Sequence, residues 1–473
     1  RIAGGGYSSS HSTMHSFENN DVYIVSLRKY VNKQSDFILD TRSMELTVNA
    51  GYTLKTIYDK INTAGSQTKY QLKTTPSNPN YTIGGCVSAP CYGGNITESF
   101  LYDSVIRMRV MNSDGHVSWI EDDDILRYHK GSMGVFGIIT HVVLAIDEAK
   151  HNILSKYSTM QVGASITCGS DNETARNIVK KFMKSMVQKS FYTQFVYDMY
   201  SNMLYGYGCI DLVQNNKKGN LDFHQSGVNE NGKIITPIYK EGVLSEDIEG
   251  VPRLRMQKAS DPKRVECNHR RSKTAMRAFV ALHMWDIEQK FKHNTSTSKT
   301  LLWDENATKS LYMTYYIPID KDFGNVYKAL KIVHDATNAL PEDSHYCPEM
   351  PVQFQFLQSS CNVFSPIKDG KMYMAITLHT MKFTLDVEGS DMMSQSWRNY
   401  YAEIESGFRS IKGVPDYSGV YGFDDPSDIL SDDSIKQVLN PKDKRKIKTF
   451  LAQGDPNGTL QSMYIQQMLD DEE

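Results

Sequence analysis

Three glycine-rich segments in the first third of the chain constrain its fold more than any other feature. The first, Gly4-Gly5-Gly6, follows a short β-prone stretch and leads into hydroxyl-bearing residues. The second covers 82–95 and contains two Gly-Gly steps, and the third covers 131–140 and runs into an apolar strand. Glycine lets a backbone turn tightly and approach a ligand closely, and successive amides can form an anion-binding nest. The first segment, taken alone, favours an ordinary strand turn, and only the three segments together are specific.

Two common nucleotide-binding motifs do not account for these segments. No strand–GxGxxG–helix context fits the second or the third, which excludes a Rossmann fingerprint there. No Gly-Lys-Ser/Thr follows either segment, so neither reads as a P-loop.

Short strands and a few helices are predicted along the whole chain. Residues 1–148 form what we call the first unit. In it, 54–64 has the apolar spacing of a helix, and Asn112-Ser113-Asp114-Gly115 comes after a strand pattern and predicts a hairpin turn. The strands expected from these patterns are 22–27, 45–50, 105–111, 119–120, 138–146, 310–319, 352–357 and 372–379. Amphipathic helices are expected near 171–188 and 326–333. This mixture predicts an α+β fold, and 473 residues exceed what one core usually holds.

The order and spacing of the three segments resemble the FAD domain of the vanillyl-alcohol oxidase and p-cresol methylhydroxylase (PCMH) family. Within that family the chain looks like the sugar-1,4-lactone oxidases of the gulonolactone and arabinonolactone type. The matching segments are 46–51, 82–85, 105–110, 114–115 and 134–144, with weaker matches at 315–318, 351–366, 413–415 and 455–458. Residues 150–310 show no match.

The resemblance implies three structural parts. A PCMH-type FAD-binding domain would cover 1–148, and a second α+β substrate (cap) domain would cover 149–409. Long loops are expected at 213–275, where apolar periodicity is poor. Residues 410–473 would return to the FAD domain and end in an acidic tail.

The resemblance also implies which residues hold FAD. The first segment would face the diphosphate, the second would line the flavin and ribityl chain, and Ile138 would lie on the adenine side. The expected cofactor-binding residues are Gly4, Gly5, Gly6, Tyr7, Ser8, Ser9, Gly84, Gly85, Ser88, Cys91, Gly94, Gly137 and Ile138.

The sequence departs from the family where flavin is often bonded covalently. Many members carry a His after the first glycine turn, and Tyr7 stands there, with His11 four residues on as a weak substitute. Tyr92 occupies the place of a second His beside the flavin. Non-covalent FAD is the simpler interpretation, while Cys91 leaves a cysteinyl link open.

The substrate side departs further from the family pattern. Lactone oxidases show a Glu and an Arg two residues apart on a strand, and both positions are glutamines here, Gln353 and Gln355. A glutamine bonds hydroxyls but supplies neither charge nor a general base. Another family Glu falls at Thr314, and Tyr417 lies where a basic or His/Trp cluster is usual. The residues expected to contact substrate are Gln353, Gln355, Tyr92 and Tyr417.

Two functions therefore remain open. An active enzyme would oxidise a hydroxyl-bearing carbon of a sugar or aldonolactone by hydride transfer to FAD. A catalytically degenerate protein would keep the flavin fold as a structural or assembly scaffold, with protein partners or copies of itself.

Composition limits the other functions. The net charge of −3 gives no electrostatic basis for nucleic-acid binding, and no run of about 18 apolar residues predicts a membrane span. The seven cysteines include no CxxC pair, which disfavours a metal site. The chain opens on Arg1 inside a strand pattern, so we expect residues before it to be missing, and any targeting signal with them. The compartment is therefore not predicted.

Overall fold

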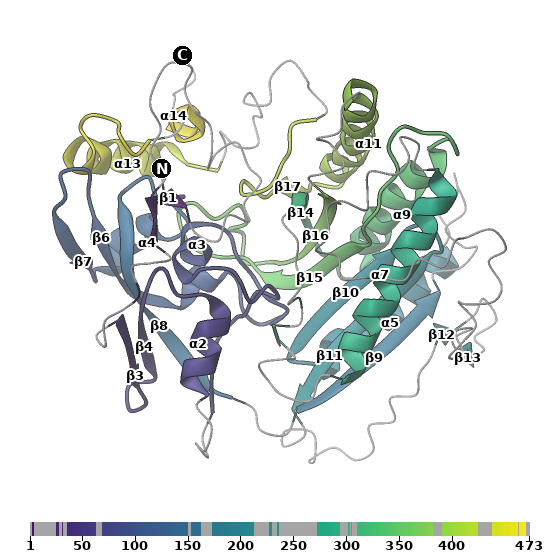
Figure 1. The fold of residues 1–473 in the computed structure, drawn as a ribbon, viewed down its shortest axis with the longest axis horizontal. Helices are drawn as coiled ribbons and strands as arrows, with labels where there is room; N and C mark the ends of the chain where they lie inside the picture. Colours follow the sequence, from purple (N-terminus) through teal and green to yellow (C-terminus); the bar gives the residue numbers. More distant parts are fainter. Residues whose placement is uncertain are drawn as a thin grey trace.

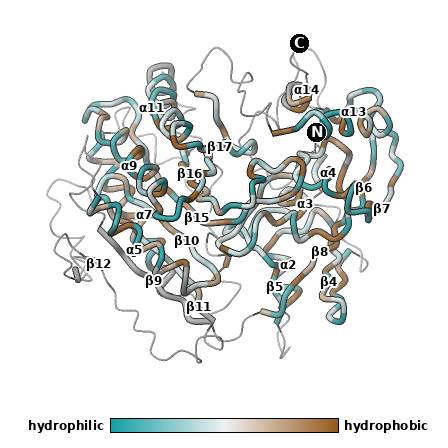
Figure 2. The backbone as a smooth tube through the Cα atoms, turned by 180° about the vertical axis from the view of Figure 1, so that it is seen from behind, coloured by the Kyte–Doolittle hydropathy of each residue, from teal (hydrophilic) through white to brown (hydrophobic). Residues whose placement is uncertain are grey.

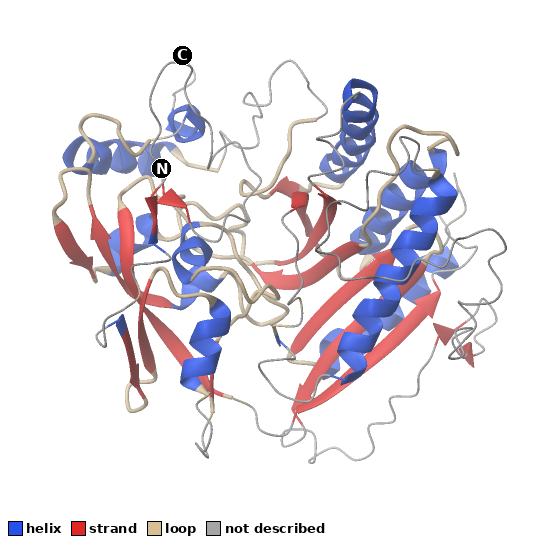
Figure 3. Cartoon of the chain, viewed as in Figure 1, coloured by secondary structure: helices blue, strands red, loops and turns tan. Residues whose placement is uncertain are grey.

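The computed structural model describes most of the chain. The described residues are 2–3, 25–27, 31, 36–62, 69–149, 153–161, 173–211, 227–228, 234–235, 272–293, 301–302, 304, 310–381, 390–423, 438–461 and 463–469. They form two antiparallel sheets that lie side by side, each with helices of its own (Figures 1 and 3).

The first sheet is built from the first 148 residues. Its strands follow the order β3 (Phe37–Asp40), β4 (Glu45–Asn49), β8 (Ile138–Glu148), β6 (Val105–Met111) and β7 (Val117–Ile120). The short strand β5 (Tyr70–Leu72) pairs with the far end of β8. Hydrophobic residues lie along β8 and its neighbouring strands (Figure 2). Such residues are expected in strands at the centre of a core.

Short helices cover this sheet, and their ends have clear causes. The helix α2 (Leu54–Ile61) begins where the Thr53 hydroxyl accepts from the Thr56 amide, and it buries Leu54, Ile57, Tyr58 and Ile61. The second glycine segment forms a helix, α3 (Ile83–Ser88), capped in the same way by Thr82. A short 3₁₀ helix (Leu101–Ser104) and α4 (Asp123–His129) complete this layer. Before this sheet, β1 (Ile2–Ala3) pairs in parallel with β2 (Val25–Ser26).

The second sheet contains seven strands from the middle and end of the chain. Their order is β17 (Val414–Pro415), β14 (Ser310–Pro318), β16 (Met372–Met381), β15 (Val352–Gln358), β10 (Tyr192–Asp198), β11 (Met203–Asp211) and β9 (Ile153–Gln161). Within 213–275 the described part contains the two-residue strands β12 (Gly227–Val228) and β13 (Ile234–Ile235), and the first turn of a helix.

Long helices cover one face of the second sheet (Figure 1). They are α5 (Glu173–Lys189), α7 (Lys273–His293), α9 (Gly324–Ala339) and α11 (Ser390–Ser410). Ring contacts fix this packing, such as Phe182 of α5 on Phe195 of β10 at 6.3 Å and Tyr315 of β14 on Phe408 of α11 at 5.6 Å. The opposite face is therefore left for the other half of the molecule.

The chain returns to the first sheet at its end. Helix α13 (Pro441–Gly454) follows the second sheet, and α14 (Met463–Leu469) packs beside it. The Tyr128 hydroxyl of α4 donates to Asp443 at 2.6 Å, and Ser113 donates to the Gly454 carbonyl at 2.9 Å. Among the helices in the described ranges, none combines the length and the apolar character that crossing a membrane requires.

Candidate active site

The second sheet carries its polar side chains on the face away from the long helices. Along β15, Phe354 and Phe356 point into the helical side, where Phe354 stacks on Phe195 at 4.9 Å with an interplanar angle of 7°. Because side chains alternate along a strand, Gln353 and Gln355 lie on the opposite face. This alternation predicts a polar surface at the middle of the sheet, facing the first unit.

Four polar residues stand in register across four strands of this face. Gln353 of β15 is the cross-strand partner of Thr377 in β16, and Thr377 is the partner of Thr314 in β14. Asp416 follows β17 directly, and its amide donates to the Thr314 carbonyl at 2.9 Å. The Thr314 and Thr377 hydroxyl oxygens are 2.7 Å apart. We call Asp416, Thr314, Thr377 and Gln353 the polar row.

A tyrosine from the first unit contacts the polar row. Tyr92 follows α3, and its hydroxyl lies 3.2 Å from the Thr377 hydroxyl. Its ring meets Phe100 and Tyr316 edge to face, with centroids at 6.4 and 6.0 Å. Burial is the main cause that raises the pKa of Tyr92, so the phenol stays protonated at neutral pH.

Asp416 places a carboxyl group at the end of the polar row. The side chain is 3% exposed and accepts from the Ser418 amide and the Ser418 hydroxyl, both at 2.8 Å. Burial raises the pKa of Asp416 from 3.8 to about 6, although the hydrogen bonds from Ser418 favour its charged form. The glutamines of β15 are therefore accompanied by an acid that sequence analysis did not single out.

The four residues expected to contact substrate do not all meet. Tyr92 and Gln353 both neighbour Thr377 and are half-buried. Gln355 is 6% exposed and donates to Gln194 of β10, so its amide is already engaged. Tyr417 is 1% exposed and packs in a separate apolar cluster with residues such as Tyr128 and Phe364. Asp416 follows the end of β17 and Tyr417 begins the turn after it, so these two neighbours in the chain lie in different surroundings.

The first glycine segment cannot be assessed in the structure. Its expected cofactor-binding residues lie outside the described ranges; they are Gly4, Gly5, Gly6, Tyr7, Ser8 and Ser9.

The second glycine segment presents an open face of small residues. Gly84, Gly85 and Ser88 are half-exposed in α3, although a Cβ atom on Gly84 would lie 2.9 Å from both the Cβ atom and the carbonyl oxygen of Ala50. A Cβ atom on Gly85 would meet only the Thr82 hydroxyl oxygen, at 3.2 Å. A flat ligand could therefore lie against this side of the helix. Gly94 instead is buried against β10, where a Cβ atom would come within 2.1 Å of the Thr193 carbonyl oxygen.

Two thiols also lie in this segment. Cys91 is half-buried, and its side chain hydrogen-bonds to Cys86, which together with burial raises the pKa of Cys86. A thiol held protonated is a poor nucleophile, so Cys86 is not suited to covalent attachment of a cofactor.

The third segment is shaped by close backbone approach. Gly137 has φ +141°, and a Cβ atom there would lie 2.5 Å from the Met111 carbonyl oxygen. Ile138 begins β8, half-exposed, opposite Met111 of β6. The glycine is required for the two strands to meet at this turn.

The described residues fit the ring portion of FAD better than its diphosphate. The Gly84 amide donates to the Ala50 carbonyl at 2.9 Å, and the Gly131 amide to the Val87 carbonyl at 2.9 Å. The Gly93 amide donates to the Thr74 hydroxyl at 3.1 Å. These donors are used within the chain, which leaves the first glycine segment as the expected diphosphate cradle. The α3 face and the polar row supply small and hydroxyl-bearing surfaces of the kind a flavin contacts.

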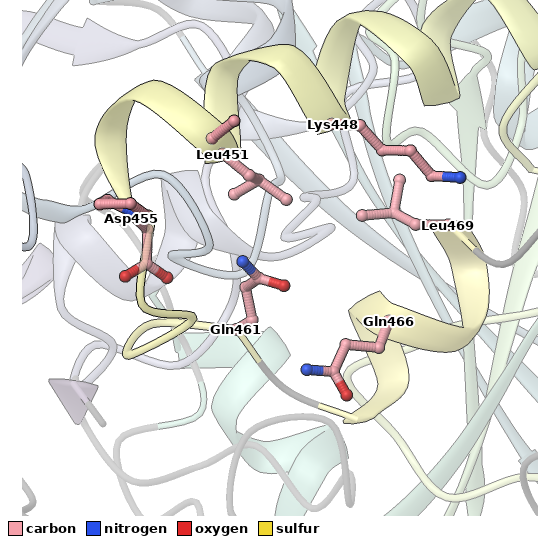
Figure 4. Close-up of a pocket in the computed structure, with 8 residues that line it drawn as sticks. Lys448, Leu451, Asp455, Gln461, Gln466 and Leu469 are labelled. Carbon is pink, nitrogen blue, oxygen red and sulfur yellow. The ribbon is translucent and has the colours of Figure 1, made fainter.

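Two cavities lie elsewhere, around the C-terminal helices. One of about 270 Å³ opens between α13 and α14, and its lining includes Lys448, Asp455 and Gln466 (Figure 4). The other, of about 310 Å³, lies between α13 and the first sheet and includes His129 and Phe136. Neither includes a member of the polar row. Within the described ranges no group of three or more His, Cys, Asp or Glu side chains is arranged to hold a metal.

Comparison with known proteins identifies the fold. No family model matches the sequence, and no curated protein matches it. Among solved structures the chain is similar to 6-hydroxy-D-nicotine oxidase from Arthrobacter nicotinovorans, with a TM-score of 0.55 and 13% sequence identity. The match covers 97% of this chain and 84% of the other. At this identity the likeness is one of fold, and it does not support the sugar-lactone oxidase subgroup. The two-part α+β fold that the sequence resemblance implied is confirmed, and it is the fold that the chain shares with this oxidase.

Proposed function

We propose that the protein is an FAD-dependent oxidoreductase that oxidises a hydroxyl-bearing carbon of a small sugar or aldonolactone-type substrate. The observation that carries this proposal is the polar row with Tyr92 beside it, at the junction of the two sheets. Junctions between domains are common places for ligand sites, and hydroxyls and amides suit a polyhydroxylated ligand. The shared fold with an oxidase supports the same interpretation.

The cofactor is proposed to be FAD held without a covalent bond. Backbone amides of 4–6 with Ser8 and Ser9 would hold the diphosphate, and Gly84, Gly85 and Ser88 would lie against the ring portion. When bound, the flavin would accept a hydride from the substrate carbon. Tyr7 and Cys91 are the residues to inspect if the flavin proves covalent.

The substrate is proposed to be neutral and rich in hydroxyl groups. Thr314 and Thr377 carry hydroxyls, Gln353 carries an amide, and Asp416 adds an acceptor that bonds hydroxyl donors strongly. The groups that act on Asp416 are a serine and a tyrosine rather than a cation. This composition favours polyols and lactones over anionic substrates.

A specific observation favours the alternative, a catalytically degenerate scaffold. Tyr92 is packed between Phe100 and Tyr316 and is hydrogen-bonded across the junction, while Gly94 is in tight contact with Thr193. Protein side chains thus fill part of the junction. A scaffold would retain these contacts whether or not flavin is bound.

Spectroscopy of the purified protein separates the two functions. The enzyme is expected to show flavin absorbance that acid releases into solution, and an aldonolactone or sugar alcohol should bleach it without oxygen. Gly85→Val projects into the open face of α3 and should lower the flavin content. Gly454→Val is the matched control, because a Cβ atom there meets no atom within 4 Å. Bound flavin that no polyol or lactone reduces would support the scaffold.

A further inference from the structure

One acid on the polar face has surroundings suited to proton transfer. The Asp416 amide donates to the carbonyl of Thr314, a member of the Thr314–Thr377 pair, and three tyrosines feel the charge of its carboxylate: Tyr92 from the first unit, and Tyr312 and Tyr316 from β14. Tyr312, Thr314 and Tyr316 alternate along β14, so all three point to the polar face.

A continuous hydrogen-bonded path joins this carboxylate to a more accessible group. The Tyr312 hydroxyl donates to the Ser418 hydroxyl at 2.9 Å, and the Ser418 hydroxyl donates to Asp416 at 2.8 Å. Asp416 is 3% exposed, whereas Tyr312 is half-buried. The two hydroxyls can each give one proton and take another, so protons can pass along the path without movement of the backbone.

We propose that Asp416 is the proton acceptor of the site and that Tyr312 and Ser418 form the route by which the substrate's hydroxyl proton reaches it. This inference rests on the proposed function. It names a residue outside the glutamine pair of β15, which cannot act as a general base.

The step balances in atoms and electrons. The substrate carbon loses a hydrogen with both bonding electrons to the oxidised flavin, the oxidant that the proposed function supplies. The substrate O–H proton moves to the Tyr312 oxygen while the Tyr312 proton moves to Ser418 and the Ser418 proton to Asp416. The substrate C–O single bond becomes C=O, and the carboxylate becomes a carboxylic acid.

Burial moves the pKa values of the tyrosines and of the histidine near the path away from neutral pH. Burial raises the pKa of Tyr92, Tyr312 and Tyr316, so these phenols remain neutral. His379 lies beside Tyr312, with ring centroids 6.2 Å apart, and burial lowers its pKa to about 4. Tyr81 and Cys91 also face Tyr312, and burial raises the pKa of Tyr81. A pH dependence near neutrality would therefore report on Asp416.

The test is the rate of anaerobic flavin reduction by an aldonolactone, L-gulono-1,4-lactone, or a sugar alcohol, sorbitol, between about pH 5 and about pH 8. In the wild-type protein the rate should rise with pH, reach half its maximum near pH 6 and level off about one pH unit higher, because only the carboxylate accepts a proton. Asp416→Asn should be slower by about 10²- to 10⁴-fold and should lose this pH dependence. Ser418→Ala and Tyr312→Phe, which break the path, should each slow reduction and leave flavin content unchanged.

Asp198→Asn is the matched control. Asp198 is likewise buried and accepts from a serine, Ser201, and from two backbone amides, but it lies at the end of β10 and outside the polar row. Its variant should keep the wild-type rate and pH profile. A second measurement needs no activity: the midpoint of thermal unfolding of Asp416→Asn relative to wild type should change between about pH 4 and about pH 7.

Three results would overturn the assignment of Asp416, and they can be told apart. An Asp416→Asn variant that keeps the pH-dependent rise overturns the proton-acceptor role while the oxidoreductase stands. Wild-type flavin that neither probe reduces removes the proposed function, and the inference fails with it. Equal effects of Asp416→Asn and Asp198→Asn on rate would show that any loss of a buried acid slows the protein, which also overturns the assignment.

Discussion

Among single residues, Asp416 shows most clearly how burial and hydrogen bonding have opposite effects on a pKa. Its carboxyl group accepts two hydrogen bonds from Ser418, yet removal from water still raises its pKa to about 6. The folded protein therefore binds this proton more tightly than the unfolded chain, whose value is 3.8. Stability from this group is fully present below about pH 3.8 and is lost as the pH rises through about 6.

This linkage predicts how Asp416→Asn changes stability with pH. The variant lacks the titrating group, so its free energy of unfolding should gain about 3 kcal/mol relative to wild type between acid and neutral pH. Urea unfolding of both proteins at about pH 4 and about pH 7 measures the difference. A gap between the two proteins that is the same at both pH values would contradict the raised pKa.

The glutamine pair of the second sheet makes a separate prediction. Gln355 donates to Gln194, and both side chains are almost fully buried. Gln355→Leu leaves the Gln194 oxygen without this donor and should destabilise the protein by about 1–3 kcal/mol. The double change Gln194→Leu with Gln355→Leu removes both polar groups and should recover most of that loss. Chemical denaturation of the three proteins tests this, and a double variant that loses as much as two independent single changes would refute it.

At the level of residues, two of the side chains expected to contact substrate lie together in the structure. Tyr92 and Gln353 could be proposed because the family pattern aligns them, and the structure brings both beside Thr377. Asp416 was missed because its place depends on the pairing of β17 with β14, strands about a hundred residues apart. The signal that could have revealed it is an acid placed directly after a short β-prone stretch within an otherwise uncharged segment.

Among the elements, those with strong local periodicity were predictable. The structure confirms strands at 45–49, 105–111 and 138–148 and the helix α2, each close to the expected bounds. Helix α7 was not predicted, because it follows a segment poor in apolar periodicity. The α3 helix was also missed, since its two glycines favour turns and the helix depends on the Thr82 cap and on contacts with Ala50.

A substitution at Gly137 tests whether the turn before β8 requires a glycine. Gly137→Ala should destabilise the protein by about 2 kcal/mol or more, because the new Cβ would meet the Met111 carbonyl oxygen at 2.5 Å and φ is +141°. Gly370→Ala is the matched control, with φ +75° and no atom within 4 Å, and should cost only about 1 kcal/mol. Urea denaturation provides both values. Equal losses for the two variants would show that the close approach of Gly137 to β6 is not required.

At the scale of the whole molecule, the two sheets share one apolar core. Buried residues of both belong to a single cluster, and Gly94 lies where the first unit touches β10. A Cβ atom on Gly94 would overlap the Thr193 carbonyl oxygen, so Gly94→Ala must push the two units apart.

We expect Gly94→Ala to lower stability by about 2 kcal/mol or more and to separate the unfolding of the two units. Far-UV circular dichroism and tryptophan fluorescence, followed through one urea titration, should then give different midpoints. Gly454→Ala, where nothing lies within 4 Å, should leave both midpoints together. Coincident midpoints in Gly94→Ala at wild-type stability would contradict a tight junction.

The central claim is that the junction of the two sheets is the active site of a flavin-dependent oxidoreductase. The most direct test is the visible spectrum of the purified protein, recorded without oxygen before and after a panel of aldonolactones and sugar alcohols is added. The account predicts a flavin band that acid can release and that at least one of these compounds bleaches in the wild-type protein. Absence of flavin, or a flavin band that none of these compounds changes, would contradict it.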